Sequence, residues 1–476
     1  MTQATTTSTD PASAARRPAP ETDIAATCQT LRSSFDAGIT RSYEWRAQQL
    51  RQLLRMVEES ESEMVDALKQ DLSKPYFEAW SAEPQFLKAE LQLTLKKLKS
   101  WMKPKRVAAS MAVHPARARI VPEPLGVALI IGAWNYPIQL SLAPLIGAIA
   151  AGNCAVVKPS ELAPASSALQ KRLIDKYMDR DCIRVIEGGV QETSALLEQR
   201  WDHIFYTGGG AVGRIVMAAA SKHLAPVTLE LGGKSPCIVD HDVDLDTAAR
   251  RIVWGRFFNA GQTCVAPDYV LVHESLEQPL LERLKAVITE FYGEDPQRSP
   301  DYARIINTRH FERLSKLLTS GEVVTGGQTD AAQRYIAPTV LRGITGDEPV
   351  MADEIFGPIL PVLKVANVDE AIRFVNQRPK PLALYIFTKD KTTSDRVVER
   401  TSSGGVCIND VISHMLPPDL PFGGVGASGM GSYHGKGSFN CFSHLKSVLD
   451  KPTFLDPPLR YPPYTEDKVK WVKRLL

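Results

Sequence analysis

The strongest constraint on the fold of this 476-residue chain is a series of short apolar runs, each followed by a segment of helical pattern. From Gly126 onward the runs read "VALIIG", "CAVVKPS", "CIRVIEG" and "HIFYTGG". Their apolar residues are continuous instead of alternating, which is typical of strands buried on both faces of a parallel sheet. The helical segments supply the crossovers that parallel strands need. This part of the chain is therefore predicted to form a parallel α/β domain.

A second series of apolar runs follows the first. It starts near "PVTLELGGKSPCIV" and includes "YVLVH", "PLALYIFT" and "GGVCIND", again with helical segments between them. The predicted fold class is therefore α/β, with two Rossmann-like parallel-sheet domains. Helical spacing is also found over residues 41–70 and 83–98. The alternating, proline-containing "ARARIVPEPLG" indicates an edge strand or a hairpin.

The composition indicates a soluble globular protein in a reducing compartment, so we expect a cytoplasmic location. Lys plus Arg number 56 and Asp plus Glu 54, which leaves a net charge of +2 and no strong field for nucleic acid or an anionic membrane. The seven cysteines form no Cys-x-x-Cys pair, so neither a disulfide framework nor a metal site is indicated. Residues 125–157 carry no charge, but Asn135, Pro137 and Pro144 interrupt them, so no membrane span is predicted.

A glycine-rich turn follows the fourth apolar run. Gly208, Gly210 and Gly213 fit the pattern G-x-G-x-x-G after a strand and before a helix, where backbone amides attract the phosphates of a dinucleotide. A tight turn without a ligand explains the same glycines. Glu230 follows this motif and has three interpretations: the acid that binds a ribose hydroxyl, a general base between the two domains, or a solvent-exposed carboxylate at a strand end.

Other polar residues stand at the ends of predicted strands, where the ligand sites of α/β proteins gather. Asn135 in "IIGAWNYP" is one, although it could equally cap the next helix. Lys158 and Glu161 in "VVKPSE" could bind the ribose of a nucleotide or form an ion pair at a helix start. Cys264 lies in the polar turn "NAGQTCVAP", where an exposed thiol near a helix end is drawn toward the thiolate. A structural cysteine is the alternative.

Six motifs taken together resemble those of the aldehyde dehydrogenase superfamily in order and distance: "GAWNYP", "VVKPSE", "YTGGGAVG", "LELGGKSP", "GQTC" and "EIFGP". The longer segments "GQTCVAPDY" and "PFGGVGASGMGSYHGKGSF" are similar to its class 3 branch, which includes fatty and aromatic aldehyde dehydrogenases and the coniferyl aldehyde type. The resemblance covers nearly everything after about residue 25. Gly209 is a departure, because the glycine turn of this family usually carries Asn or Ser there.

The resemblance implies that Cys264 is the nucleophile, Glu230 the general base and Asn135 the oxyanion donor. It implies cofactor contacts by a further set of residues: Trp134, Lys158, Glu161, Gly208, Gly209, Gly213, Glu354 and Phe356. The expected reaction is NAD(P)-dependent oxidation of a medium-to-long aliphatic or an aromatic aldehyde to the acid, through a thiohemiacetal and a thioester, with NAD preferred and NADP also accepted.

Two alternatives to this reaction are a coenzyme A-acylating dehydrogenase and a catalytically silent binding protein on the same fold. Glu230, as a base that activates water, argues against the first. The presence of Cys264, Glu230 and Asn135 together argues against the second.

The resemblance also implies how the chain is divided. We expect an NAD(P)-binding domain over 21–104 and 125–229, a catalytic domain over 230–415, oligomerisation or bridging segments over 105–124 and 416–445, and a C-terminal extension over 446–476. Residues 1–20 are rich in Thr, Ser, Ala and Pro, and this composition predicts a disordered tail, with an organelle transit peptide as the alternative. The segment 105–124 is expected to be a β hairpin that pairs between the subunits of a homodimer.

Overall fold

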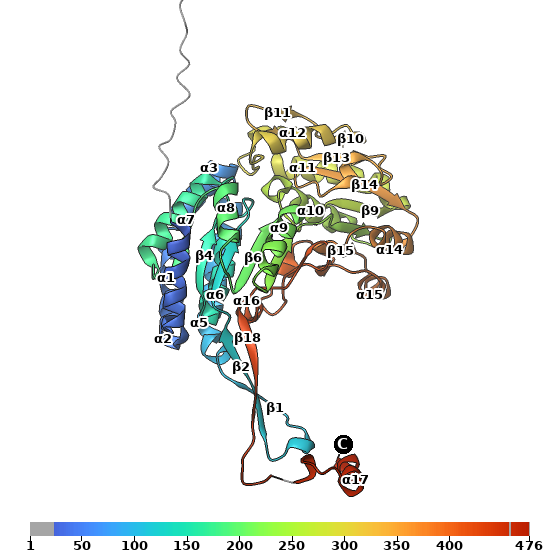
Figure 1. Cartoon of the computed structure of the whole chain (residues 1–476). Helices are drawn as coiled ribbons and strands as arrows, with labels where there is room; N and C mark the ends of the chain where they lie inside the picture. The colour runs from blue at the N-terminus through green and yellow to red at the C-terminus, as the bar shows by residue number, and fades with distance from the viewer. Residues whose placement is uncertain (1–22, 457, 476) are drawn as a thin grey trace, which may run out of the picture.

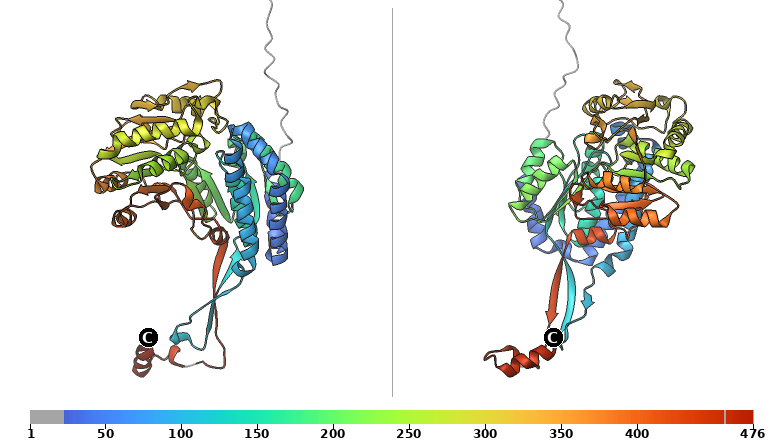
Figure 2. Two further views of the ribbon diagram at one scale, coloured as in Figure 1. Left: turned by 180° about the vertical axis from the view of Figure 1, so that it is seen from behind. Right: turned by 90° about the vertical axis from the view of Figure 1, so that its right-hand side faces the viewer.

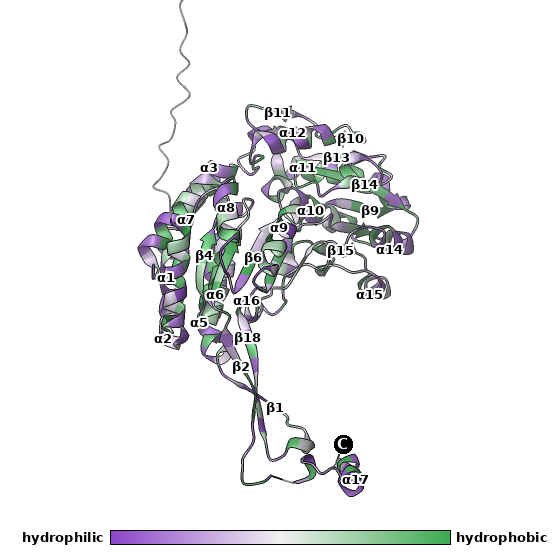
Figure 3. Ribbon diagram, in the orientation of Figure 1, coloured by the Kyte–Doolittle hydropathy of each residue, from purple (hydrophilic) through white to green (hydrophobic). Residues whose placement is uncertain are grey.

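Two parallel sheets organise the chain in the computed structural model, which describes residues 23–456 and 458–475 (Figure 1). The tail predicted over 1–20 lies outside the described residues. The predicted α/β class with two Rossmann-like domains is confirmed. Hydrophobic residues concentrate in the strands of both sheets, whereas the outer helices present hydrophilic residues (Figure 3).

The first sheet has six strands, in the spatial order β17 (Gly429–Met430), β7 (Val227–Leu231), β6 (His203–Gly208), β3 (Val127–Ile131), β4 (Cys154–Lys158) and β5 (Ile183–Val185). All neighbours are parallel except β17, which is antiparallel to β7. The four apolar runs of the first series therefore form β3 to β6 as predicted. Their core residues are almost completely buried, because helices cover the sheet.

The helices of this half are α1 (Ile24–Asp36), α2 (Tyr43–Glu59), α3 (Glu61–Leu72), α4 (Tyr76–Ala82), α5 (Pro84–Trp101), α6 (Gln139–Ala151), α7 (Pro164–Tyr177), α8 (Val190–Leu197) and α9 (Gly210–Ser221). The helical pattern over 41–70 is divided between α2 and α3, which meet at Ser60. Helix α6 is buried along its whole length. The uncharged segment that contains it is therefore an interior helix between two buried strands.

The second sheet has seven strands, in the order β10 (Glu322–Thr325), β13 (Thr339–Arg342), β14 (Ile359–Val365), β9 (Tyr269–His273), β8 (Pro236–Val239), β15 (Ala383–Phe387) and β16 (Gly405–Ile408). Only β10 is antiparallel to its neighbour. The helices are α10 (Leu245–Phe257), α11 (Glu277–Tyr292), α12 (Thr308–Leu317), α13 (Pro349–Ala352), α14 (Val368–Asn376) and α15 (Lys391–Arg400), and β11 (Thr329–Asp330) pairs with β12 (Tyr335–Ile336) in a small ribbon. The apolar runs of the sequence did not identify β13 and β14.

A third, antiparallel sheet projects from the body (Figures 1 and 2). It contains β1 (Lys105–Val107), β2 (Arg117–Pro124) and β18 (Ser443–Asp450), with β2 in the centre. The predicted hairpin is therefore two strands of a three-stranded sheet, because β18 returns from the end of the chain to pair with β2. Helix α16 (Lys436–Cys441) precedes β18, and α17 (Glu466–Leu475) follows it. Among the described residues, no helix is both long and apolar enough to cross a membrane.

Strand β7 corrects the predicted domain boundary. The sequence assigned "PVTLEL" to the second series and placed the boundary between residues 229 and 230. In the structure β7 pairs with β6, so this boundary falls inside a strand of the first sheet. Glu230 therefore stands on the first sheet, two residues before the chain leaves it at Gly232.

Candidate active site

A cavity of about 620 Å³ lies between the two sheets, at the carboxyl ends of β3, β4, β6 and β7. Its lining includes most residues that the sequence singled out: Trp134, Asn135, Lys158, Glu161, Gly208, Gly209, Glu230, Cys264, Glu354 and Phe356. Gly213 does not belong to the lining. Motifs as far apart in the sequence as Trp134 and Phe356 thus meet in one place.

The turn that carries Cys264 has a strained backbone. Helix α10 ends at Phe257, and the next residues include Asn259, Ala260 and Gly261 with φ of 54°, 51° and 73°. This left-handed region is costly for a residue with a Cβ, although Asn tolerates it better than Ala. A Cβ on Gly261 would also collide with a backbone carbonyl. The turn is fully buried, so the surrounding contacts must hold it in this conformation.

The thiol of Cys264 is less acidic than the sequence suggested. Burial raises the pKa of Cys264 above its usual range, and the nearby carboxyl groups of Glu354 and Glu230 raise it further. Cys264 follows the turn after α10 and does not open a helix. The direction of its pKa shift is therefore opposite to the one expected for a thiol in a polar turn near a helix end.

Asn135 is held against the Cys264 turn. It is only 3% exposed, and its Nδ2 donates a hydrogen bond of 3.1 Å to the carbonyl oxygen of Gln262. A side-chain amide has two N–H donors, so the second remains for another acceptor. The hydroxyl groups of Tyr136 and Thr263 are 2.6 Å apart and join the same two segments. Asn135 therefore does not act as the side-chain cap of α6.

Glu230 is a buried carboxyl group without a hydrogen-bond partner. It is 3% exposed, lines the cavity, and neither of its oxygens has a partner among the described residues. Burial raises its pKa well above the usual value. A buried carboxyl without partners is costly and is therefore a candidate functional group. The interpretation as a solvent-exposed carboxylate at a strand end is wrong.

One end of the cavity is formed by aromatic residues and a second buried carboxyl. Phe356 has a φ of 51°, and its ring meets that of Trp134 edge-on at 5.2 Å. Burial and the nearby Asp268 raise the pKa of Glu354 to about 8. Gly232 lets this carboxyl approach the backbone, because a Cβ there would overlap with Glu354 Oε2 and would force that side chain to move.

The opposite end of the cavity has the features of a nucleotide site. Lys158 Nζ donates a hydrogen bond of 2.8 Å to Glu161 Oε2, so these two residues form the ion pair at the end of β4. Gly209 precedes α9, whose N-terminus has no side-chain cap, and a Cβ on Gly209 would meet nothing within 4 Å. Gly213 of α9 faces Leu231 of β7, and a Cβ on Gly213 would lie 2.9 Å from the Leu231 side chain, so this glycine allows the helix and the strand to pack closely.

The structure adds cavity residues that the sequence did not indicate. Val190 of α8 and Val212 and Ile215 of α9 are 81%, 43% and 59% exposed and line the nucleotide end. Other new residues line the remainder: Leu140, His310, Arg313, Leu382, Phe422 and Tyr433. Apolar residues of this kind have no sequence signal that separates them from core residues.

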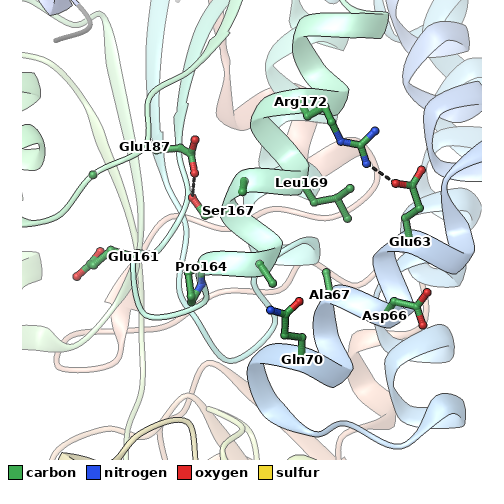
Figure 4. Close-up of a pocket in the computed structure, with 13 residues that line it drawn as sticks. Glu63, Asp66, Ala67, Gln70, Glu161, Pro164, Ser167, Leu169, Arg172 and Glu187 are labelled. Carbon is green, nitrogen blue, oxygen red and sulfur yellow. Dashed lines mark hydrogen bonds and ion pairs between the residues drawn. The ribbon is translucent and has the colours of Figure 1, made fainter. Parts of the chain in front are cut away.

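A second cavity of about 780 Å³ adjoins the first at Glu161 (Figure 4). Arg172 forms an ion pair with Glu63 on one side of this cavity. On the other side, Ser167 Oγ donates a hydrogen bond of 3.0 Å to Glu187 Oε1. The walls beside Lys158 and Glu161 therefore carry more negative than positive charge.

Known proteins are similar to this chain over nearly its whole length. The model of the family described as "Aldehyde dehydrogenase family" matches residues 4–448. Aldehyde dehydrogenase family 3 member H1 of Arabidopsis thaliana is 50% identical, over 94% of this chain and 93% of that protein. Aldehyde dehydrogenase family 3 member B1 of Rattus norvegicus is 52% identical, over 93% of this chain and 95% of that protein.

Solved structures agree with the sequence comparisons. The substrate-bound state of Staphylococcus aureus AldH superposes with a TM-score of 0.93 at 46% identity, covering 95% of this chain and 99% of that one. An NAD-dependent aldehyde dehydrogenase from Sinorhizobium meliloti gives a TM-score of 0.83 at 27% identity, over 91% of this chain and 88% of that one. The chain therefore belongs to the aldehyde dehydrogenase family and is an NAD(P)-dependent aldehyde dehydrogenase.

Proposed function

We propose that Cys264, Asn135 and Glu230 carry out the oxidation of an aldehyde to its acid in the cavity between the two sheets. The observation that supports this most strongly is their convergence: the three residues come from three separate segments and line one cavity. Each side chain has the chemical group that one step of the reaction needs.

The first step is the attack of the Cys264 thiolate on the aldehyde carbon. The carbonyl oxygen becomes negative, and the free N–H of the Asn135 amide and the backbone N–H of Cys264 donate hydrogen bonds to it. When bound, NAD(P) supplies the acceptor for the hydride that leaves this carbon. A thioester then remains on Cys264. Glu230 takes a proton from water, and the attack of this water on the thioester carbon releases the acid and the thiolate.

The nucleotide end of the cavity fits the cofactor. The uncapped N-terminus of α9 presents backbone amides, and the open space at Gly209 allows a phosphate to approach them. Glu161 accepts a hydrogen bond from a ribose hydroxyl, and Lys158 holds the Glu161 carboxylate in place. The apolar side chains of Val190 and Val212 flank a flat base. NAD is preferred over NADP, because the wall beside Glu161 is negatively charged.

The substrate is a medium-to-long aliphatic or an aromatic aldehyde. Leu140, Leu382 and Phe422 line the same cavity as Cys264 and add apolar surface to it. The unpartnered carboxyl of Glu230 favours water over coenzyme A as the acceptor of the acyl group, because it is positioned to activate a water molecule. A panel of aldehydes of increasing chain length tests both points: acid and reduced cofactor should form without coenzyme A. Turnover only in the presence of coenzyme A would contradict the proposal.

The functional unit is a homodimer. The sheet of β1, β2 and β18 projects from the body, and β18 leaves an open edge that carries the exposed Leu445 and Leu449 (Figure 2). Exposed strand edges of this kind are sites of pairing with another chain. Light scattering should give about twice the 52.4 kDa mass of one chain. A single-chain mass at micromolar concentration would contradict the dimer.

A further inference from the structure

A completely buried ion pair lies against the loop that carries Asn135. Lys74, between α3 and α4, and Glu83, between α4 and α5, approach to 2.6 Å, and both side chains are 0% exposed. Burial lowers the pKa of Lys74, and Glu83 opposes this effect. Two charges without contact to water destabilise a protein unless further hydrogen bonds satisfy them. The other contacts of this pair therefore indicate what it does.

These further hydrogen bonds are all made to the loop between β3 and α6. Lys74 Nζ donates a hydrogen bond of 2.8 Å to the carbonyl oxygen of Asn135. The second oxygen of Glu83 accepts hydrogen bonds from the two backbone amides at the start of α6, those of Ile138 at 2.9 Å and Gln139 at 3.1 Å. The ion pair thus fixes the loop at both sides of Tyr136.

The same carbonyl oxygen of Asn135 also receives a hydrogen bond from the Cys264 turn. Asn259 Nδ2 donates to it at 3.0 Å, and the backbone N–H of Asn259 donates to Glu78 Oε2 at 2.9 Å. Asn135 is therefore bonded through its carbonyl to Lys74 on one side and to the strained turn on the other. The Asn135 backbone cannot move without breaking one of these buried hydrogen bonds. Because the backbone is held, the position from which the side-chain amide extends is held as well.

We propose that Lys74 is a positioning residue of the oxyanion site: it fixes the Asn135 amide relative to Cys264. This inference rests on the proposed role of Asn135 as oxyanion donor. Lys74 does not touch the reacting atoms and acts through the Asn135 backbone. A displacement of about 1 Å at such a donor costs on the order of a hundredfold in rate.

The test measures the rate of the first turnover, observed as reduced cofactor, in Lys74→Met and in Lys74→Met/Glu83→Gln. The double variant removes both charges of the ion pair, so Glu83 is not left as a buried carboxylate opposite an uncharged residue, and it serves if the single variant does not fold. Both should lose roughly tenfold to a hundredfold in this rate, with the dissociation constant of NAD changed by less than about threefold. A double variant with the wild-type rate would show that Lys74 only neutralises Glu83 and would overturn the proposal.

Arg46→Met is the matched control. Arg46 is a buried cation that donates to two backbone carbonyls, those of Thr40 and Ala150, and Ala150 lies at the opposite end of the same helix α6. Its loss should reduce thermal stability, as the loss of Lys74 does, but leave the first-turnover rate within about twofold of wild type. An equal loss of rate in Arg46→Met would mean that the effect of Lys74 is general destabilisation.

A double-mutant cycle with Asn135→Ala separates this inference from the proposed function. If Lys74 acts through Asn135, Lys74→Met should change the rate of the Asn135→Ala enzyme by less than about twofold. Full additivity of the two losses would overturn the positioning role. A normal rate in Asn135→Ala alone is a different result, because it would remove the oxyanion role of Asn135 itself.

Discussion

The side-chain amide of Asn135 donates a hydrogen bond to the carbonyl oxygen of Gln262, two residues before Cys264. This bond of 3.1 Å joins the loop after β3 of the first sheet to the turn after α10 of the second. Asn135 and Cys264, the proposed oxyanion donor and nucleophile, are therefore on segments that are joined before a substrate arrives. Arrangements that exist before the reaction are the ones that stabilise developing charge most effectively.

Asn135→Ala should lower kcat on the order of a hundredfold or more, because it removes one of two donors to the oxyanion. Steady-state measurement of kcat and KM separately checks this. A change in KM alone would assign Asn135 to substrate binding instead.

Cys264→Ala should abolish aldehyde oxidation, because the covalent step is lost, and leave NAD binding intact. Titration with NAD, followed by the fluorescence of the protein, measures the binding. Cys28→Ala is the control: Cys28 is a partly buried cysteine of α1, away from the cavity, and its variant should retain near-normal activity. Substantial turnover by Cys264→Ala would refute its role as nucleophile.

Glu230→Gln should block the release of the acid more than the transfer of hydride. Rapid mixing should then show about one equivalent of reduced cofactor per site, followed by a stall. Weaker cofactor binding with an unchanged steady-state rate would instead support the interpretation of Glu230 as a ribose ligand.

The activity should rise with pH on the alkaline side of neutrality. Cys264 and Glu230 are both proposed to act in their deprotonated forms, and burial raises the pKa of each. At neutral pH, the deprotonated fraction of each group is therefore smaller than it would be for the same group exposed to water. The pH profile of kcat measures this. Glu230→Gln should remove the pH dependence of acid release but keep that of the first turnover. A flat or falling wild-type profile would contradict the deprotonated forms as the reactive ones.

Glu161→Gln should improve catalytic efficiency with NADP relative to NAD. In the proposed arrangement, the carboxylate would accept a hydrogen bond from the 2′-hydroxyl of NAD and would repel the 2′-phosphate of NADP. Glu187→Gln, on the wall of the adjoining cavity, should shift the ratio in the same direction by less, since Glu187 is exposed and its field is screened. Glu63→Gln is the control, because Glu63 is paired with Arg172. An unchanged ratio in Glu161→Gln would mean that Glu161 does not face the ribose.

The parallel strands and the motif residues could be predicted from the sequence because each has a local signal. The continuous apolar runs of β3 and β4 identify strands buried on both faces, and "GQTC" or "VVKPSE" resembles a family in a few adjacent residues. The place of β7 could not be predicted in this way. Its run "VTLEL" is compatible with a strand of the first or of the second series. Only its pairing with β6 in the structure assigns it to the first sheet.

The contacts that hold the site have no local signal either. Lys74 and Glu83 stand beside prolines between helices, where charged residues are usually exposed, and only the fold places them in the interior. The pKa of Cys264 depends on Glu230 and Glu354. These two residues are distant from Cys264 in the sequence but lie near it in the cavity. Burial and long-range proximity are properties of the whole fold, so a short sequence window does not contain them.

The projecting sheet also sets the order in which the protein can fold. Strand β2 is complete at Pro124, yet its partner β18 begins only at Ser443, the residue that pairs with Pro124. The outer edge of strand β7 is likewise unpaired until Gly429 and Met430 of β17 have been synthesised. Contacts between distant parts of a chain form slowly, because a long loop must close first. Two strand edges of the nascent protein therefore stay open until β17 and β18 have left the ribosome, and this period is when chaperones should bind it.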